Sequence, residues 1–271
     1  MERPIGIIDS GVGGLTVTNE IIKRLPKENI IYLGDKERCP YGSKTENQIK
    51  KYTWDMVNFL LKKNIKALVI ACNTATAYTL EDLEKELDIP VIGVINPGAI
   101  TALESTQNYN IGILGTDGTI RSQAYTKALH HLCPQVNVTS LACPSFVPMI
   151  EQGILSGPKL KDEVKQTLLP LQQQNKCDTL VLGCTHYPLI KDTIQDVMGS
   201  EIKLVSSGEA TARVAKSVLK KYGIDNKTDK IPTYNFYTTG DLKLFTKTAQ
   251  ILFQDFTGHV TSVMIDRVSL Y

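Results

Sequence analysis

The chain has 271 residues, of which 42% are hydrophobic and 21% charged, an ordinary composition for a globular protein of one large or two modest domains. Its 30 basic and 28 acidic residues are spread along the whole length, and the formal charge of +2 argues against nucleic acid as a partner. No apolar run reaches the roughly eighteen residues that cross a bilayer, and the first residues carry no targeting signal. We therefore expect no membrane association and a cytoplasmic location.

Short apolar runs rich in Ile and Val recur along the chain and are typical of buried strands in a parallel sheet. We predict strands over residues 4–9, 29–34, 66–71, 90–95, 109–115, 137–142, 179–183 and 202–207. Helical patterns lie between these runs. Alternating strands and helices indicate an α/β protein with mainly parallel sheets.

The clearest helix pattern spans residues 44–63, and one face carries the apolar side chains Ile49, Tyr52, Met56, Phe59 and Leu60. Ser43 and Glu46 predict a capping box at its start. A second apolar stripe is interrupted by Pro170, which predicts a break or a kink. That stripe consists of Val164, Leu168 and Leu171.

Two similar stretches, "GIIDSGVGGLTV" from Gly6 and "IGILGTDGTIRS" from Ile111, each precede a strand that ends at a cysteine. We therefore expect two similar halves that present loops at the carboxyl ends of their strands, where ligands bind in open α/β sheets. The helix-like residues 209–223 and the strand-like residues 233–240 are expected to return to the first half. This predicts a first domain of residues 1–96 and 208–271 and a second of residues 97–207.

The six cysteines show no C-x-x-C pair and no histidine at zinc-ligand spacing, so we predict neither a disulfide scaffold nor a metal site. Cys133 and Cys177 are expected to be buried structural residues. By contrast, Cys72 in "ALVIACNTATA" and Cys184 in "TLVLGCTHYPL" each stand between a strand and a helix. A helix N-terminus favours the thiolate and should lower the pKa of the thiol.

Two opposed thiols suit acid–base chemistry on a carbon that lies between them. One thiolate removes a proton from one face of the carbon, and the other thiol delivers a proton to the opposite face. This operation inverts a stereocentre.

Polar residues near these cysteines are candidate ligands for an anionic substrate. Asp9, in "DSGVGG", could orient an ammonium group or assist a thiol, and Ser10 could donate to an anion. This turn matches neither a Walker A loop nor a dinucleotide fingerprint. Tyr41 and Gly42 of the turn "CPYGS" could line a pocket. His186 could polarise the Cys184 thiol as a nearby proton carrier.

The motifs "DSGVGGLTV", "CPYG", "ACNTATA" and "GCTHYPL", in this order, resemble those of bacterial glutamate racemases. The resemblance implies two flavodoxin-like α/β domains that face a central cleft. It implies a cofactor-independent isomerase that interconverts L- and D-glutamate, with D-glutamate supplied for peptidoglycan synthesis, cell wall biogenesis and cell shape.

The resemblance also assigns roles to individual residues. Cys72 and Cys184 match the two catalytic cysteines, which serve D-glutamate and L-glutamate respectively. The matched substrate-binding positions are Asp9, Ser10, Tyr41, Gly42, Asn73, Thr74, Thr185 and His186. Thr116, Thr119 and Glu151 match further positions, and the sequence leaves their contribution open.

Three alternatives remain at this point. The chain could be an aspartate racemase or a hydantoin racemase of the same superfamily, since pocket depth is not readable from a sequence. It could also be a non-catalytic binding protein on the same fold, although the retained cysteines argue against this. No lysine stands in a pyridoxal-phosphate context, so no cofactor is expected. The oligomeric state is open, with a homodimer among the alternatives.

Overall fold

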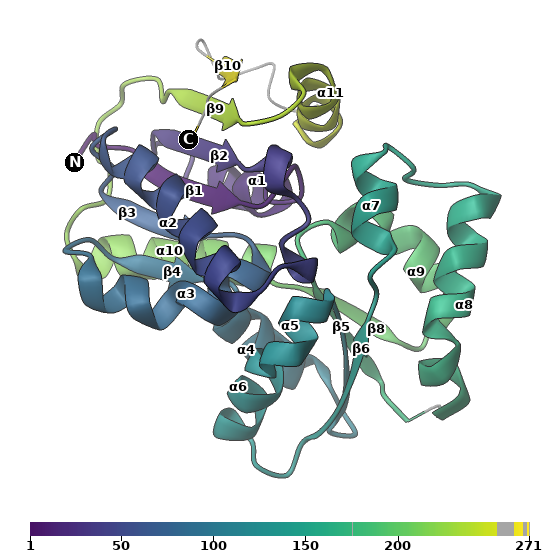
Figure 1. Cartoon of the computed structure of the whole chain (residues 1–271). Helices are drawn as coiled ribbons and strands as arrows, with labels where there is room; N and C mark the ends of the chain where they lie inside the picture. The colour runs from purple at the N-terminus through teal and green to yellow at the C-terminus, as the bar shows by residue number, and fades with distance from the viewer. Residues whose placement is uncertain (175, 254–262, 268–269, 271) are drawn as a thin grey trace.

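The computed structural model describes residues 1–174, 176–253, 263–267 and 270, which form two parallel sheets flanked by helices (Figure 1). The first sheet has the order β10-β9-β2-β1-β3-β4, and the second has the order β6-β5-β7-β8. The strands of the first sheet are β1 (Ile5–Asp9), β2 (Ile30–Gly34), β3 (Ala67–Ile70), β4 (Val91–Gly93), β9 (Tyr234–Thr238) and β10 (Val263–Arg267). Those of the second are β5 (Asn110–Gly115), β6 (Asn137–Ala142), β7 (Thr179–Gly183) and β8 (Lys203–Ser206).

Helices cover the faces of both sheets. Those of the first half are α1 (Leu15–Arg24), α2 (Glu46–Leu61), α3 (Asn73–Glu86), α10 (Gly208–Lys221) and α11 (Leu242–Leu252). Those after β4 are α4 (Ile95–Ser105), α5 (Asp117–Ser122), α6 (Ala124–Leu132), α7 (Phe146–Glu151), α8 (Pro158–Gln174) and α9 (Lys191–Met198). Three short 3₁₀ turns are η1 (Lys36–Arg38), η2 (Tyr41–Ser43) and η3 (Tyr187–Ile190). No helix in the described part of the chain is long and apolar enough to cross a membrane.

The two sheets repeat one topology, which confirms the predicted pair of flavodoxin-like α/β units. In each sheet the first strand of the half lies between the second and the third, so β2-β1-β3-β4 corresponds to β6-β5-β7-β8. All described strand pairings are parallel. Every residue of β1, β2, β3 and β7 is buried, as expected for short apolar strands with helices on both faces.

All eight predicted strands are present, but two of them are less buried than expected. β6 and β8 form the edges of the second sheet, and most of their residues are exposed or half-buried. The tail returns to the first sheet as predicted, because β9 pairs with β2.

The helix predictions need two corrections. The capping box of α2 is formed by Thr45 and Gln48, whereas Ser43 instead donates to the carbonyl of Pro40. Both residue pairs fit the same sequence pattern, and the helix begins two residues later than expected. Of the predicted break or kink at Pro170, the break is wrong, because α8 continues to Gln174 with Pro170 inside it; the kink stays a prediction. The three apolar side chains of its stripe are buried in the second half.

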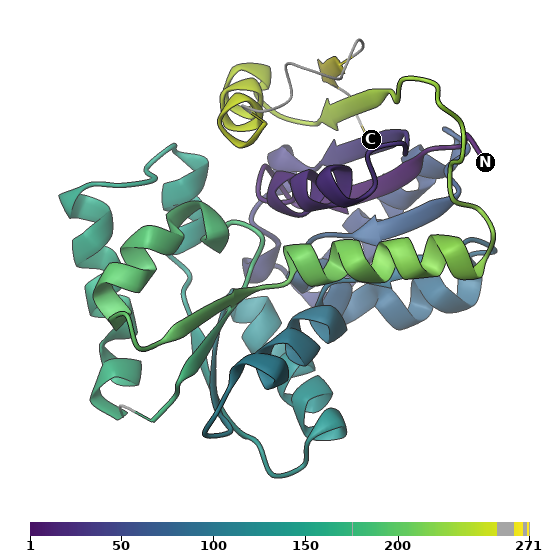
Figure 2. The ribbon, with the colours of Figure 1, turned by 180° about the vertical axis from the view of Figure 1, so that it is seen from behind.

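The chain crosses between the halves twice, at α4 and at α10. Ile95 and Ala99 of α4 pack with Ile111 of the second sheet. Ala212 and Ala215 of α10 lie in the core of the first half. Seen from behind, α10 lies along the first sheet and β8 of the second sheet leads into it (Figure 2). We therefore propose that residues 1–96 with 208–271, and residues 97–207, form two domains.

Candidate active site

One enclosed cavity is lined by residues that follow β1 and β3 of the first sheet and β5 and β7 of the second. Its free volume is about 10 Å³, which is room for one water at most. The lining residues are Ser10, Pro40, Tyr41, Gly42, Cys72, Asn73, Thr74, Thr116, Val147, Cys184, Thr185 and His186. The fold therefore brings both candidate cysteines to one cavity, together with most of the polar residues singled out in the sequence.

Cys72 is the N-cap residue of α3, and the surrounding groups favour its neutral form. Its Sγ accepts a hydrogen bond from the backbone N–H of Ala75 at 3.4 Å and lies 3.6 Å from Ser10 Oγ. Burial, followed by the negative charge of Asp9, nevertheless raises the pKa of Cys72 to about 12. The lowered pKa expected from the helix N-terminus is therefore wrong for Cys72, because desolvation outweighs the N–H contact.

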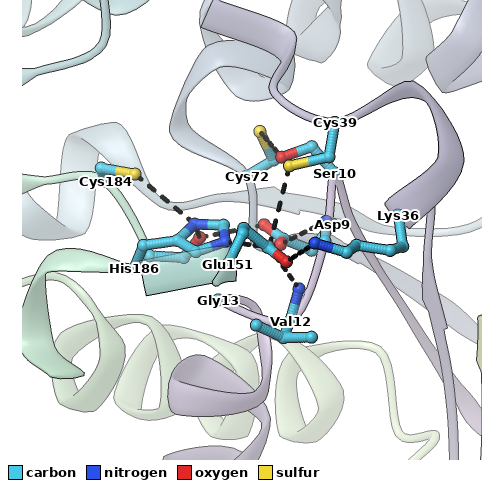
Figure 3. Close-up of polar contacts among 12 residues, drawn as sticks. Asp9, Ser10, Val12, Gly13, Lys36, Cys39, Cys72, Glu151, Cys184 and His186 are labelled. Carbon is cyan, nitrogen blue, oxygen red and sulfur yellow. Dashed lines mark hydrogen bonds and ion pairs between the residues drawn. The ribbon is translucent and has the colours of Figure 1, made fainter. Parts of the chain in front are cut away.

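Cys184 follows β7 and faces an imidazole. Its Sγ lies 3.7 Å from His186 Nδ1, and His186 Nε2 lies 2.5 Å from Glu151 Oε1 (Figure 3). Burial alone would lower the pKa of His186, but its contacts with Cys184 and Glu151 raise this pKa well above its usual value. These contacts favour the protonated imidazole beside the Cys184 sulfur.

Glu151 stands at the end of α7 and joins the two halves. Burial alone would raise its pKa, but His186 and then Lys36 lower the pKa of Glu151 to about 2. Its Oε1 accepts from the backbone N–H of Val12 at 3.2 Å, and its Oε2 pairs with Lys36. A Cβ on Gly11 would lie 2.3 Å from Oε1, so the glycine allows this close approach.

Asp9 does not line the cavity but lies directly behind it. Its Oδ1 accepts from Thr185 Oγ1 at 3.1 Å, and its Oδ2 accepts from the backbone N–H of Gly11 at 3.0 Å. Burial raises the pKa of Asp9, and the nearby His186 opposes this shift. Asp9 therefore connects β1 with the loop that carries Cys184.

Three threonine hydroxyl groups meet where the halves touch. Thr74 Oγ1 lies 2.8 Å from Thr116 Oγ1 and 3.0 Å from Thr119 Oγ1. A Cβ on Gly42 would lie 2.4 Å from the Cβ of Thr116, so a larger residue there would force the halves apart. The structure thus places Thr116 and Thr119, which the sequence left open, against Thr74.

Asn73 has a polar side-chain atom without a hydrogen-bond partner among the described residues, whereas the Tyr41 hydroxyl is hydrogen-bonded. Asn73 Oδ1 accepts from Tyr125 Oη at 2.7 Å, whereas its buried Nδ2 has no partner among the described residues. Tyr41 Oη donates to Asp35 Oδ2 at 2.5 Å. A free donor such as Asn73 Nδ2 suits an anionic ligand, whereas the Tyr41 hydroxyl is already engaged.

Sequence reasoning missed two neighbours of Glu151. They are Lys36, which pairs with Oε2, and Cys39, whose Sγ lies 3.7 Å from Oε1. No metal-ligand spacing is visible in the sequence, yet the fold brings ligand atoms of Cys39, Glu151 and His186 within 4.8 Å of one another. Positions so distant in the chain carry no local signal.

Two further cysteines and a larger surface hollow do not combine both candidate thiols. Cys133 and Cys177 are half-buried rather than buried, and neither lines the cavity. A larger hollow of about 440 Å³ lies between α1 and the start of α10 and reaches Cys184, but it does not reach Cys72. The small cavity combines both thiols among the residues that the structure describes, so it could serve both faces of a carbon atom.

Comparison with known proteins identifies relatives over nearly the whole chain. The sequence model of the Asp/Glu/Hydantoin racemase family matches residues 5–215. A glutamate racemase of Oceanobacillus iheyensis is 54% identical over 255 residues, which cover 94% of this chain and 93% of the relative.

Two solved structures share the fold. A glutamate racemase isoform from Bacillus anthracis has a TM-score of 0.90 at 43% identity, covering 99% of this chain and 98% of that chain. A glutamate racemase from Francisella tularensis in complex with D-glutamate has a TM-score of 0.87 at 36% identity, with the same coverage.

Proposed function

This chain belongs to the Asp/Glu/Hydantoin racemase family, and we propose that it interconverts L- and D-glutamate. The observation that carries this proposal is the single cavity that takes Cys72 from one half and Cys184 from the other. Glutamate is favoured over aspartate or hydantoin because the relatives at 46–54% identity over most of the chain are glutamate racemases. The same relatives disfavour a non-catalytic binding protein.

The proposed mechanism uses the two thiols as opposed acid and base. The Cys184 thiolate takes the α-proton of L-glutamate and becomes a thiol, leaving a carbanion-like centre. The Cys72 thiol then gives its proton to the opposite face, which forms D-glutamate and a Cys72 thiolate. The reverse reaction exchanges the two roles, and proton exchange with solvent restores the starting form.

The groups around each sulfur suit these roles. Burial and Asp9 hold Cys72 as a thiol, with a pKa of about 12, and a thiol is the form that donates to the carbanion. Protonated His186 faces Cys184 across 3.7 Å and can stabilise a negative charge on that sulfur. Glu151, in turn, holds the imidazole through Nε2.

Fixed dipoles would bind the carboxylates of glutamate. Asn73 Nδ2 is a buried donor without a described partner, and the backbone N–H groups at the start of α3 lie beside it. The hydroxyls of Thr74 and Thr116 stand at the same cavity. The hydroxyl of Thr185, which lines the cavity and donates to Asp9 behind it, would accept from the ammonium group. Such preorganised groups can stabilise the developing negative charge without a cofactor.

We further infer that the D-glutamate serves peptidoglycan synthesis in the cytoplasm. The resemblance of the motifs to bacterial glutamate racemases supports this role. Depletion of the protein in its host should make growth depend on added D-glutamate. Growth that is indifferent to D-glutamate would rule the role out.

Polarimetry on purified protein tests the reaction and its substrate. The optical rotation of L-glutamate should decay to zero, whereas L-aspartate and a 5-substituted hydantoin should keep theirs. Decay with one of the latter and not with L-glutamate would reassign the substrate. Constant rotation with all three would leave a binding protein.

A further inference from the structure

Three side chains that commonly ligate metals converge beside the cavity, and neither proposed base is among them. Cys39 Sγ lies 3.7 Å from Glu151 Oε1, and that same oxygen lies 2.5 Å from His186 Nε2. All three ligand atoms lie within 4.8 Å of one another. In Figure 3 the dashed lines from the thiol and from the imidazole both reach the Glu151 carboxylate.

We propose that Cys39, Glu151 and His186 bind a zinc-class divalent cation that holds the cleft shut. Cys39 lies in the loop after β2 of the first sheet, whereas Glu151 ends α7 and His186 follows β7 of the second sheet. One ion would therefore link loops from both halves. Thiolate, imidazole and carboxylate are the ligand types that zinc prefers.

Two of the three distances between ligand atoms can be compared with those around this ion. Tetrahedral zinc with its usual bond lengths sets sulfur and oxygen ligands about 3.6 Å apart, and nitrogen and oxygen ligands about 3.4 Å apart. Cys39 Sγ and Glu151 Oε1, at 3.7 Å, already match. The His186–Glu151 hydrogen bond of 2.5 Å would open by about 1 Å as the ion replaces its proton. Three protein ligands leave a fourth position for water.

Lys36 pairs with Oε2, the Glu151 oxygen that the ion does not need, and can stay in place. Zinc binds thiolate and neutral imidazole, so occupation of the site releases any protons that these ligands carry.

Binding should inhibit by blocking access. The cavity holds about 10 Å³ in this closed arrangement, far less than a glutamate molecule needs, so the halves must separate before substrate binds. Zinc would oppose that separation, and high glutamate should overcome it. The inhibition rests on the proposed racemase function, whereas the metal binding does not.

A metal titration tests binding independently of activity. Metal-free protein should develop thiolate-to-cobalt charge-transfer absorption with cobalt(II). Zinc should raise the melting temperature by roughly 5 °C or more at a hundredfold excess over Kd. Cys39→Ser should abolish the absorption, and Glu151→Gln should weaken binding by more than the roughly 10–100-fold that an outer-shell partner contributes. Circular dichroism would verify that each variant is folded.

Two controls separate this site from the proposed bases. Cys133→Ser removes a half-buried thiol outside the cavity, and it should keep both signals, as should Cys72→Ala. Unchanged absorption in Cys39→Ser, or its loss in Cys72→Ala, would overturn the proposal.

Inhibition of racemisation by zinc is the second measurement that tests the site. Zinc should raise the KM for L-glutamate in the wild type and leave kcat nearly unchanged. The activity of Cys39→Ser, measured relative to the same variant without metal, should need at least a tenfold higher zinc concentration for the same inhibition. Equal inhibition of the wild type and Cys39→Ser by zinc would refute the proposal that a zinc ion at this site holds the cleft shut. Absence of racemisation without metal would instead refute the proposed function, while the cobalt titration would still decide the site.

Discussion

Reaction in heavy water tests the opposed arrangement of Cys72 and Cys184 most directly. Burial and Asp9 raise the pKa of Cys72 to about 12, well above neutral pH, so this thiol keeps its hydrogen. In heavy water this thiol therefore carries a solvent deuteron before L-glutamate binds. D-Glutamate formed early should hold close to one deuteron at its α-carbon.

Recovered L-glutamate should behave differently because each sulfur serves its own face of the α-carbon. Cys184 keeps the proton it has just taken from L-glutamate, while Cys72 supplies its own to the opposite face. That proton returns to L-glutamate whenever the complex reverses. Starting from D-glutamate, the product L-glutamate should be labelled and the recovered D-glutamate should not.

Proton NMR of the α-hydrogen in both isomers, sampled before a tenth of the substrate has reacted, measures the two labels. A matched reaction in light water, moved to heavy water only after quenching, corrects for exchange during work-up. A single base shared by both faces would label recovered substrate and product alike. Comparable early labels in the two isomers would therefore refute the assignment of Cys72 and Cys184 to opposite faces.

Three further predictions follow from the same residues. Cys72→Ala and Cys184→Ala should each lower racemisation in both directions by at least about 10²–10⁴-fold with unchanged circular dichroism, whereas Cys133→Ala and Cys177→Ala should stay active; near-wild-type racemisation by either of the first two would contradict the mechanism. Protein dialysed against a chelator should keep full activity and absorb only through its aromatic side chains, and recovery of lost activity by zinc or pyridoxal phosphate would disprove the cofactor-free reading. The Glu151 carboxylate, with a pKa of about 2 in the fold against 4.5 ordinarily, stabilises the metal-free protein above pH 4.5, and about 3 kcal/mol of this should be lost as the pH falls from 4.5 to 2. Urea unfolding at a series of pH values should show this loss in the wild type, and an equal loss in Glu151→Gln would refute it.

The positions of the strands could be predicted because the information is local. Apolar runs such as Ala67–Ile70 are too short for helices, and their burial on both faces follows from the helices that flank them. The position of α2 was predictable to within two residues, but its cap was not, because Ser43 and Thr45 both begin the same four-residue pattern. Only the backbone conformation decides between such neighbours.

Most residues that line the cavity could be singled out from the sequence, but their electrostatics could not. The motifs pointed to Cys72, yet a sequence gives the helix N-terminus without the desolvation that raises the pKa of the thiol. The contacts of Glu151 with Lys36 and Cys39 were out of reach for another reason. Lys36 and Cys39 belong to the first half and Glu151 belongs to the second, so their contacts depend on how the two halves pack.

The position of β9 beside β2 has a consequence for synthesis on the ribosome. β2 pairs with β1 on one side and β9 on the other, and β9 leaves the ribosome about 200 residues later, a delay of roughly 10–40 s at ordinary elongation rates. During that interval the nascent first sheet ends at β2, whose unpaired backbone groups form an exposed edge. The second sheet, formed entirely by residues 110–206, is complete before that edge is covered. Completion of the first sheet therefore waits for β9, and until β9 arrives the backbone edge of β2 is open to pairing with other nascent chains.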